Sequence, residues 1–146
     1  MVSRTTVIEA PFSVIWDVVT DVEKYPEFLK EVKTVRIEKR EGETVTAAHQ
    51  IEIIKMINYT LDLTKDLPNK KFLWTLVRGQ LITKNDGFWE FVEEGPARCS
   101  ATYNIDIKFG LLVPSSITNM LTEVNLPKTL DAFKKRAESV YKKSLG

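Results

Sequence analysis

The chain has 146 residues, the usual length of one domain, and 43% of them are hydrophobic, which favours a folded core over disorder. Lys and Arg number 21 and Asp and Glu 20, so the net charge of +1 argues against a DNA-binding protein. One cysteine and one histidine exclude an intramolecular disulfide and the common metal sites. Glycine-rich nucleotide motifs are absent as well, so we expect no cofactor.

The N-terminal part of the sequence predicts one strand and two short helical segments. Residues 3–9 are rich in β-forming side chains, and Ala10-Pro11 ends this strand. Apolar residues at helical spacing predict a helix over 13–20, and a second helical turn follows over 21–29. The opening residues lack an apolar segment of signal-peptide length, which leads us to expect a cytoplasmic protein.

From Val32 onward the apolar residues recur with a period of two, which is typical of half-buried strands. Tight turns separate these strands and predict an antiparallel meander, because parallel strands need long crossovers. One of the turns is expected at Asn85-Asp86-Gly87. The predicted strands cover residues 32–38, 44–53, 57–64, 71–78, 81–84, 88–93 and 99–109.

Residues 110–115 read as a loop, and the rest of the chain is helical. Pro127 lies inside this span, which predicts either one long helix bent near Asn125 to Pro127 or two helices in series. A sheet with one apolar face must cover it, and only this C-terminal helix is long enough. We therefore expect an α+β fold in a single domain over residues 1–146.

A strongly bent sheet wrapped around one helix leaves space between them, so we expect a largely apolar ligand cavity there. His49 would offer a hydrogen-bonding group on an otherwise apolar face. The same side chains also fit an ordinary core, and apolar residues on both faces of residues 71–77 leave the choice between Leu73 and Trp74 open. The candidate ligand-binding residues are His49, Ile51, Tyr59, Leu61, Trp74, Trp89, Tyr103, Ile105, Ile117, Met120, Leu121 and Val124.

Four segments together resemble the START-like (SRPBCC), helix-grip superfamily of polyketide cyclases and lipid-transport proteins. They are Ile8-Glu-Ala-Pro-Phe-Ser-Val-Ile-Trp-Asp-Val-Val-Thr-Asp, Val22-Glu-Lys-Tyr-Pro-Glu-Phe-Leu, Gly87-Phe-Trp-Glu-Phe and Leu130-Asp-Ala-Phe-Lys-Lys-Arg-Ala-Glu. The second is similar to the coenzyme-Q-binding and ribosome-association branch. The resemblance implies a curved antiparallel sheet of about seven strands around a C-terminal helix. It also implies a small hydrophobic ligand: a lipid, quinone, sterol or polyketide-like molecule.

Three functions stay open on the sequence. The chain is a carrier of such a ligand, a cyclase or dehydratase acting without metal or nucleotide, or an interaction module. The enzyme would draw its acid and base from His49, Tyr59, Tyr103, Arg78 and Glu90. The interaction module would use the basic last helix, which includes Lys134 and Lys142, to contact an anionic membrane surface, a ribosome or a protein, although a solvated helix face explains the same charges.

Overall fold

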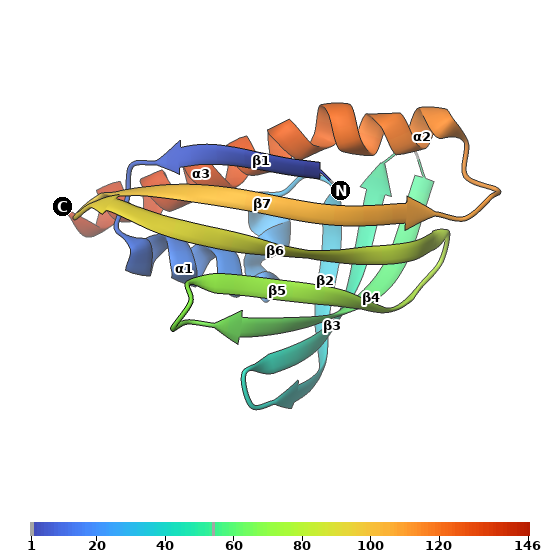
Figure 1. Cartoon of the computed structure of the whole chain (residues 1–146), viewed down its shortest axis with the longest axis horizontal. Helices are drawn as coiled ribbons and strands as arrows, with labels where there is room; N and C mark the ends of the chain where they lie inside the picture. Colours follow the sequence, from blue (N-terminus) through green and yellow to red (C-terminus); the bar gives the residue numbers. More distant parts are fainter. Residues whose placement is uncertain (1, 54) are drawn as a thin grey trace.

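The computed structural model describes residues 2–53 and 55–146 of the chain. Within them, seven strands form one antiparallel sheet in the order β1-β7-β6-β5-β4-β3-β2 (Figure 1). The sequential hairpins from β2 to β7 are the predicted meander, and β1 pairs with β7 at the far edge. The strands are β1 (Val2–Ile8), β2 (Val32–Glu41), β3 (Thr44–Ile53), β4 (Lys55–Asp66), β5 (Lys71–Gly79), β6 (Ile82–Gly95) and β7 (Arg98–Phe109).

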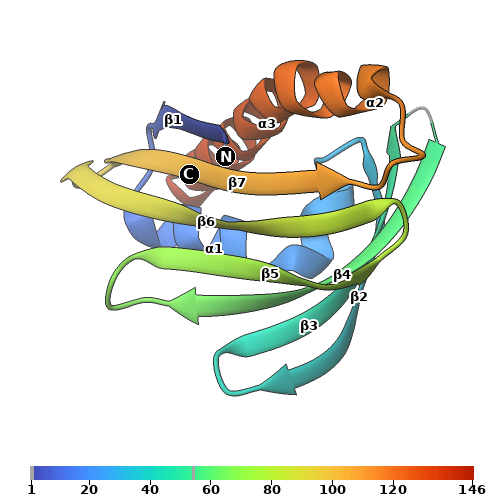
Figure 2. The same ribbon diagram turned by 45° about the vertical axis from the view of Figure 1, so that its right-hand side comes forward.

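The sheet curves strongly, and its concave face holds the helices (Figure 2). Register shifts interrupt three strand pairs, β2–β3, β4–β5 and β6–β7, and such bulges increase the local twist and bend of a sheet. The helical segments are α1 (Phe12–Thr20), the 3₁₀ helix η1 (Val22–Glu27), α2 (Ser115–Asn119), the π-helix η2 (Met120–Asn125) and α3 (Leu126–Ser144). This confirms the predicted α+β arrangement of a curved antiparallel sheet around a long C-terminal helix. None of the helices in the described ranges is long and apolar enough to span a membrane.

The C-terminal helical run is continuous, but its hydrogen-bond pattern changes before Pro127. The π-helix η2 occupies residues 120–125, and Pro127 lies in the first turn of α3. Proline has no N–H with which to continue the i→i−4 ladder, so the chain adopts a wider turn just before it. The predicted irregularity is therefore present, as a π turn joining two α-helices.

The predicted turn at Asn85-Asp86-Gly87 is wrong, because β6 runs straight through these three residues. They pair in register with β7, where Gly87 lies opposite Ile105. On the other side, the β5–β6 ladder ends at Trp74 and Gly87, and the Leu76 N–H donates to Asp86 Oδ1 instead, at 3.2 Å. Residue types that usually form turns serve here to let β5 separate from β6.

The buried side chains form two hydrophobic clusters rather than one. The larger joins α1, η1 and α3 to the sheet, and its centre is Phe133, whose ring lies 5.2 Å from each of the rings of Tyr25, Phe28 and Trp89. The smaller cluster contains Ile57 and its neighbours beneath η2 at the other end of the sheet. The space between the two clusters is the feature that positions the candidate site.

Candidate ligand-binding cavity

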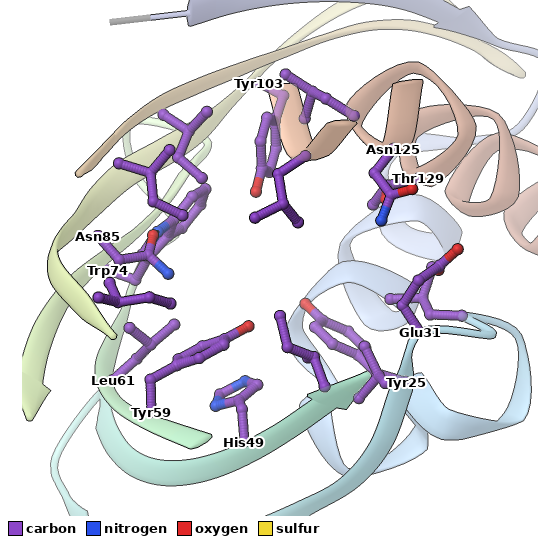
Figure 3. A pocket seen from close by; sticks show the side chains of 18 of the residues that line it. Tyr25, Glu31, His49, Tyr59, Leu61, Trp74, Asn85, Tyr103, Asn125 and Thr129 are labelled. Carbon is purple, nitrogen blue, oxygen red and sulfur yellow. The ribbon is translucent and has the colours of Figure 1, made fainter. Parts of the chain in front are cut away.

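A cavity of about 180 Å³ lies between the concave face of the sheet and the C-terminal helical run. Strands β3 to β7 form its floor and walls, and η2 and α3 close it from above (Figure 3). Its lining draws on both hydrophobic clusters, with Phe133 from the larger and Leu121 packed on the smaller. The wall is therefore mainly apolar, as expected for a site that takes an apolar molecule.

Nine of the twelve candidate residues line this cavity. Period-two alternation puts them on the concave face of their strands, except for one that comes from the π-helix. In β5 the side chain facing the cavity is Trp74, which resolves the choice against Leu73. The nine residues are His49, Ile51, Tyr59, Leu61, Trp74, Trp89, Tyr103, Ile105 and Leu121.

Three candidates from the predicted apolar helix stripe, Ile117, Met120 and Val124, are not part of the cavity wall, so the prediction that they line it is wrong. Val124 is 47% exposed, Met120 packs on the smaller cluster, and Ile117 is buried without lining the cavity. A π-helix closes i→i+5 hydrogen bonds and so carries more residues per turn than the α-helix that the stripe assumed. Leu121 and Asn125 consequently face the cavity while Val124 points outward.

Several lining residues were missed. Ile53, Leu63 and Ile107 lie two residues along the same strands from candidates that were named. The period-two alternation places them on the same face, so it could have predicted them. Others come from segments without a periodic signal, such as Tyr25 in η1. The remaining lining residues are Leu29, Glu31, Val32, Phe72, Ile82, Asn85, Asn125, Leu126, Thr129 and Phe133.

Asn85 is the most informative of the missed residues. Its side chain is buried, and its Oδ1 accepts a 3.0 Å hydrogen bond from the indole Nε1 of Trp74. Gly87 makes this contact feasible, because a Cβ there would lie 2.6 Å from Cζ2 of Trp74 and 2.2 Å from the backbone oxygen of Asn104. The Asn-Asp-Gly sequence thus builds one polar corner of the cavity.

His49 and Tyr59 form a second polar corner of the cavity. Their rings are stacked, and His49 Nδ1 lies 3.0 Å from the backbone oxygen of Ala47. Burial lowers the pKa of His49 to about 4, so its imidazole is neutral at neutral pH. Burial also raises the pKa of Tyr59, which keeps its hydroxyl protonated and able to donate a hydrogen bond.

Two further tyrosines and a polar rim complete the site. Tyr25 donates through its hydroxyl to the backbone oxygen of Val19, while the Tyr103 hydroxyl is directed toward the cavity (Figure 3). Burial is the largest cause raising the pKa of both phenols. Half-buried Glu31, Asn125 and Thr129 lie together at the edge of the cavity near α3.

Two of the residues considered as acids or bases do not reach the cavity. Arg78 pairs with Glu38, and Glu90 pairs with Lys71 at 3.5 Å. Neither is among the lining residues. The cavity lining that the structure describes contains no Lys or Arg, so its hydrogen-bonding capacity comes from neutral groups except at the Glu31 rim.

Together, the curved sheet, the closing helix and the cavity between them define a helix-grip protein built around an internal apolar site. Residues 8–134 match the family described as polyketide cyclase / dehydrase and lipid transport. The chain belongs to this family, which confirms the resemblance to the START-like superfamily.

Individual proteins agree with this assignment. The chain is 25% identical over 143 residues to the ribosome association toxin RatA of Pseudomonas aeruginosa, and 96% of each chain is covered. This similarity agrees with the branch that the Tyr25-Pro26 motif resembled.

Solved structures show the same fold at low sequence identity. A protein of Thermus thermophilus has a TM-score of 0.85 at 18% identity, covering 95% of this chain and 97% of the other. The Zhui aromatase/cyclase of Streptomyces sp. R1128 has a TM-score of 0.83 at 15% sequence identity, and the match covers 99% of this chain and 94% of the other. A START superfamily protein of Mycobacterium smegmatis has a TM-score of 0.83 at 23% sequence identity, and the match covers 95% of this chain and 97% of the other.

Proposed function

We propose that the protein binds one small, mainly apolar molecule in this cavity and acts as its carrier. The observation that carries the proposal is a cavity of about 180 Å³ whose wall is mainly apolar but has polar atoms at two places, one at Asn85 and one at His49 and Tyr59. Apolar walls contribute affinity by excluding water, and a few fixed polar atoms orient the molecule. The family description, which includes lipid transport, supports the same function.

The size of the cavity limits the ligand. Apolar cavities of about 150 Å³ are known to bind benzene, so this one holds at least one ring. Typical ligand pockets are larger, roughly 300–1,000 Å³, so a sterol or a whole isoprenoid chain would not fit inside. Among the ligand classes expected from the sequence, this favours a compound of one or two rings, with any attached chain leaving past the Glu31 rim.

Native purification followed by mass spectrometry tests the carrier function. The wild-type protein should release a small organic molecule on denaturation, and Leu121→Trp, which places an indole in the cavity, should release much less. Val92→Trp is the matched control, because residue 92 is 57% exposed and lies outside the lining. Equal recovery from wild type, Leu121→Trp and Val92→Trp would place the molecule outside the cavity and contradict the proposal.

A cyclase-type enzyme is the second candidate, favoured by the fold shared with an aromatase/cyclase and by the His49–Tyr59 pair inside the cavity. General bases work best with a pKa near the working pH, and a histidine with a pKa of about 4 is a weak base at neutral pH. This favours binding over proton abstraction. Turnover of a polyketide-like substrate that is lost in His49→Phe while its affinity is kept would reverse the preference.

Ribosome association is a third candidate, supported by the similarity to RatA and by the charge of α3. Lys128, Lys134, Lys142 and Lys143 form no ion pair with any residue that the structure describes. Contacts of lysine with RNA phosphates weaken steeply as salt rises. Co-sedimentation with ribosomes that falls with added salt and is abolished by Lys134→Glu with Lys142→Glu would support this function, and its absence at low salt would exclude it.

A further inference from the structure

Two polar side chains in the cavity each have one atom bonded to the protein and one atom free. Asn85 and His49 are both only 5% exposed, so neither is an ordinary surface group. No buried side-chain nitrogen or oxygen among the described residues lacks a hydrogen-bond partner, so these two free atoms open onto the cavity instead of being sealed in the core. A molecule that fills the cavity shuts them off from water, which costs about 1–3 kcal/mol for each atom unless the molecule supplies a partner. The free atoms therefore indicate which groups a bound molecule should supply.

The free atom of Asn85 is a donor. An indole N–H can only donate, so the amide oxygen must face Trp74, and this fixes the orientation of the whole amide. The NH₂ group then points toward the centre of the cavity, as Figure 3 shows. It has no hydrogen-bond partner among the residues that the structure describes. It can satisfy an acceptor such as a carbonyl oxygen.

The free atom of His49 is an acceptor. A backbone carbonyl can only accept, so the proton of the neutral ring lies on Nδ1, which donates to Ala47. Nε2 then carries a lone pair and makes no hydrogen bond within the described part of the chain. The ring is held in place by its stacking on Tyr59. Nε2 can satisfy a hydroxyl or an N–H group.

We propose that the ligand is an uncharged ring compound with an acceptor oxygen that meets Asn85 Nδ2 and a hydroxyl or N–H that meets His49 Nε2. This rests on the carrier function proposed above and adds the chemistry of the ligand. Tyr59 and Tyr103 can both donate and accept, so they add affinity without choosing between groups. A carboxylate would be buried with no cation in the described lining, which disfavours acidic ligands.

Three probes built on the same bicyclic skeleton test this pairing. Hydroxytetralone, with its hydroxyl and carbonyl on different rings, offers both groups, while tetralone offers only the acceptor and tetrahydronaphthol offers only the hydroxyl. Their dissociation constants follow from quenching of tryptophan fluorescence or from amide shifts of the cavity residues by NMR. We expect hydroxytetralone to bind wild type about tenfold more tightly than either single-function probe.

Two variants assign each preference to its residue. In Asn85→Leu, the carbonyl should no longer strengthen binding, while the hydroxyl still should. In His49→Phe, the hydroxyl should no longer strengthen binding, while the carbonyl still should, and the new phenyl ring can still stack on Tyr59. Asn58→Leu is the control, because Asn58 lies outside the cavity lining and should change none of the three constants. If Asn85→Leu does not fold, the dissociation constants of the three probes for wild type and for His49→Phe still test the pairing. The hydroxyl should then lose its advantage in His49→Phe alone.

The outcomes separate this inference from the proposed function. Binding of all three probes within a factor of two, or an equal loss for all three in both variants, would overturn the pairing and leave the carrier function standing. No binding of any probe, with no shift of cavity resonances up to the solubility limit, would overturn both. The crossed pattern of losses in the two variants would support both.

Discussion

The imidazole of His49 lies flat on the ring of Tyr59, with the ring centroids 5.0 Å apart and an interplanar angle of 9°. One face of the histidine is thereby shielded by an aromatic ring, and its Nδ1 is held by the Ala47 carbonyl. The chain contains no other histidine, so its titration can be followed without assignment. This makes the pair a direct probe of how dry the cavity wall is.

The first prediction concerns stability against pH. His49 has a pKa of about 4 in the folded protein and 6.5 as its ordinary value, so between these values the unfolded chain binds the proton and the folded one does not. Stability is therefore full above pH 6.5 and falls as the pH drops toward 4, by about 3 kcal/mol in total at about 1.4 kcal/mol per unit. Urea titrations at several pH values measure this loss.

His49→Phe is the control for that measurement. Its free energy of unfolding should change little from pH 7 to pH 5, where the carboxyl groups have not yet titrated appreciably. NMR of the wild-type imidazole should show a midpoint near pH 4. A midpoint near 6.5 would mean that water reaches the ring freely, contrary to its exposure of only 5%.

The second prediction is that Gly87→Ala destabilises the fold. The added methyl would meet the backbone oxygen of Asn104 at 2.2 Å and the Trp74 ring at 2.6 Å, and backbone cannot move aside cheaply. Overpacking of this kind costs typically about 1–3 kcal/mol. Gly95→Ala is the matched control, because its nearest contact would be 3.8 Å away at Arg98. Equal urea midpoints for the two variants would contradict the close packing of Trp74 over β6.

The third prediction concerns the grip of α3 on the sheet. Phe133→Ala removes a ring that contacts Tyr25, Phe28 and Trp89, and the loss should be about 3–5 kcal/mol. Val140 lies on the same helix but is 39% exposed, so Val140→Ala should cost much less. Chemical denaturation of both variants makes the comparison, and similar losses would show that α3 does not anchor the core through Phe133.

The fourth prediction concerns the reactivity of the single thiol. Cys99 is fully buried, and burial raises the pKa of its thiol to about 11, so both access and thiolate are lacking at pH 8. A thiol reagent should label the native protein slowly, at a rate limited by opening of the fold, and label it fully in denaturant. Rapid labelling of native protein would show that the β1–β7 edge, to which Cys99 belongs, is open.

The sequence by itself determined the order of elements and most of the cavity floor. Side chains alternate between the two faces of a strand, so a local pattern was enough to place His49, Tyr59 and Leu61 on one face. The breaker Pro127 likewise marked where the helical run would change. These inferences hold because each depends on residues that are neighbours along the chain.

Only the tertiary structure decided the polar corner at Asn85 and the size and shape of the cavity. Asn85 faces the cavity because its partner Trp74 lies on another strand and because Gly87 leaves room for the indole. Val124 turns outward because a π turn rotates the helix face relative to the sheet. The cavity lies where the two hydrophobic clusters meet only through half-buried side chains such as Val32 and Tyr59, and how closely they approach depends on how the whole sheet curves, which no local pattern encodes.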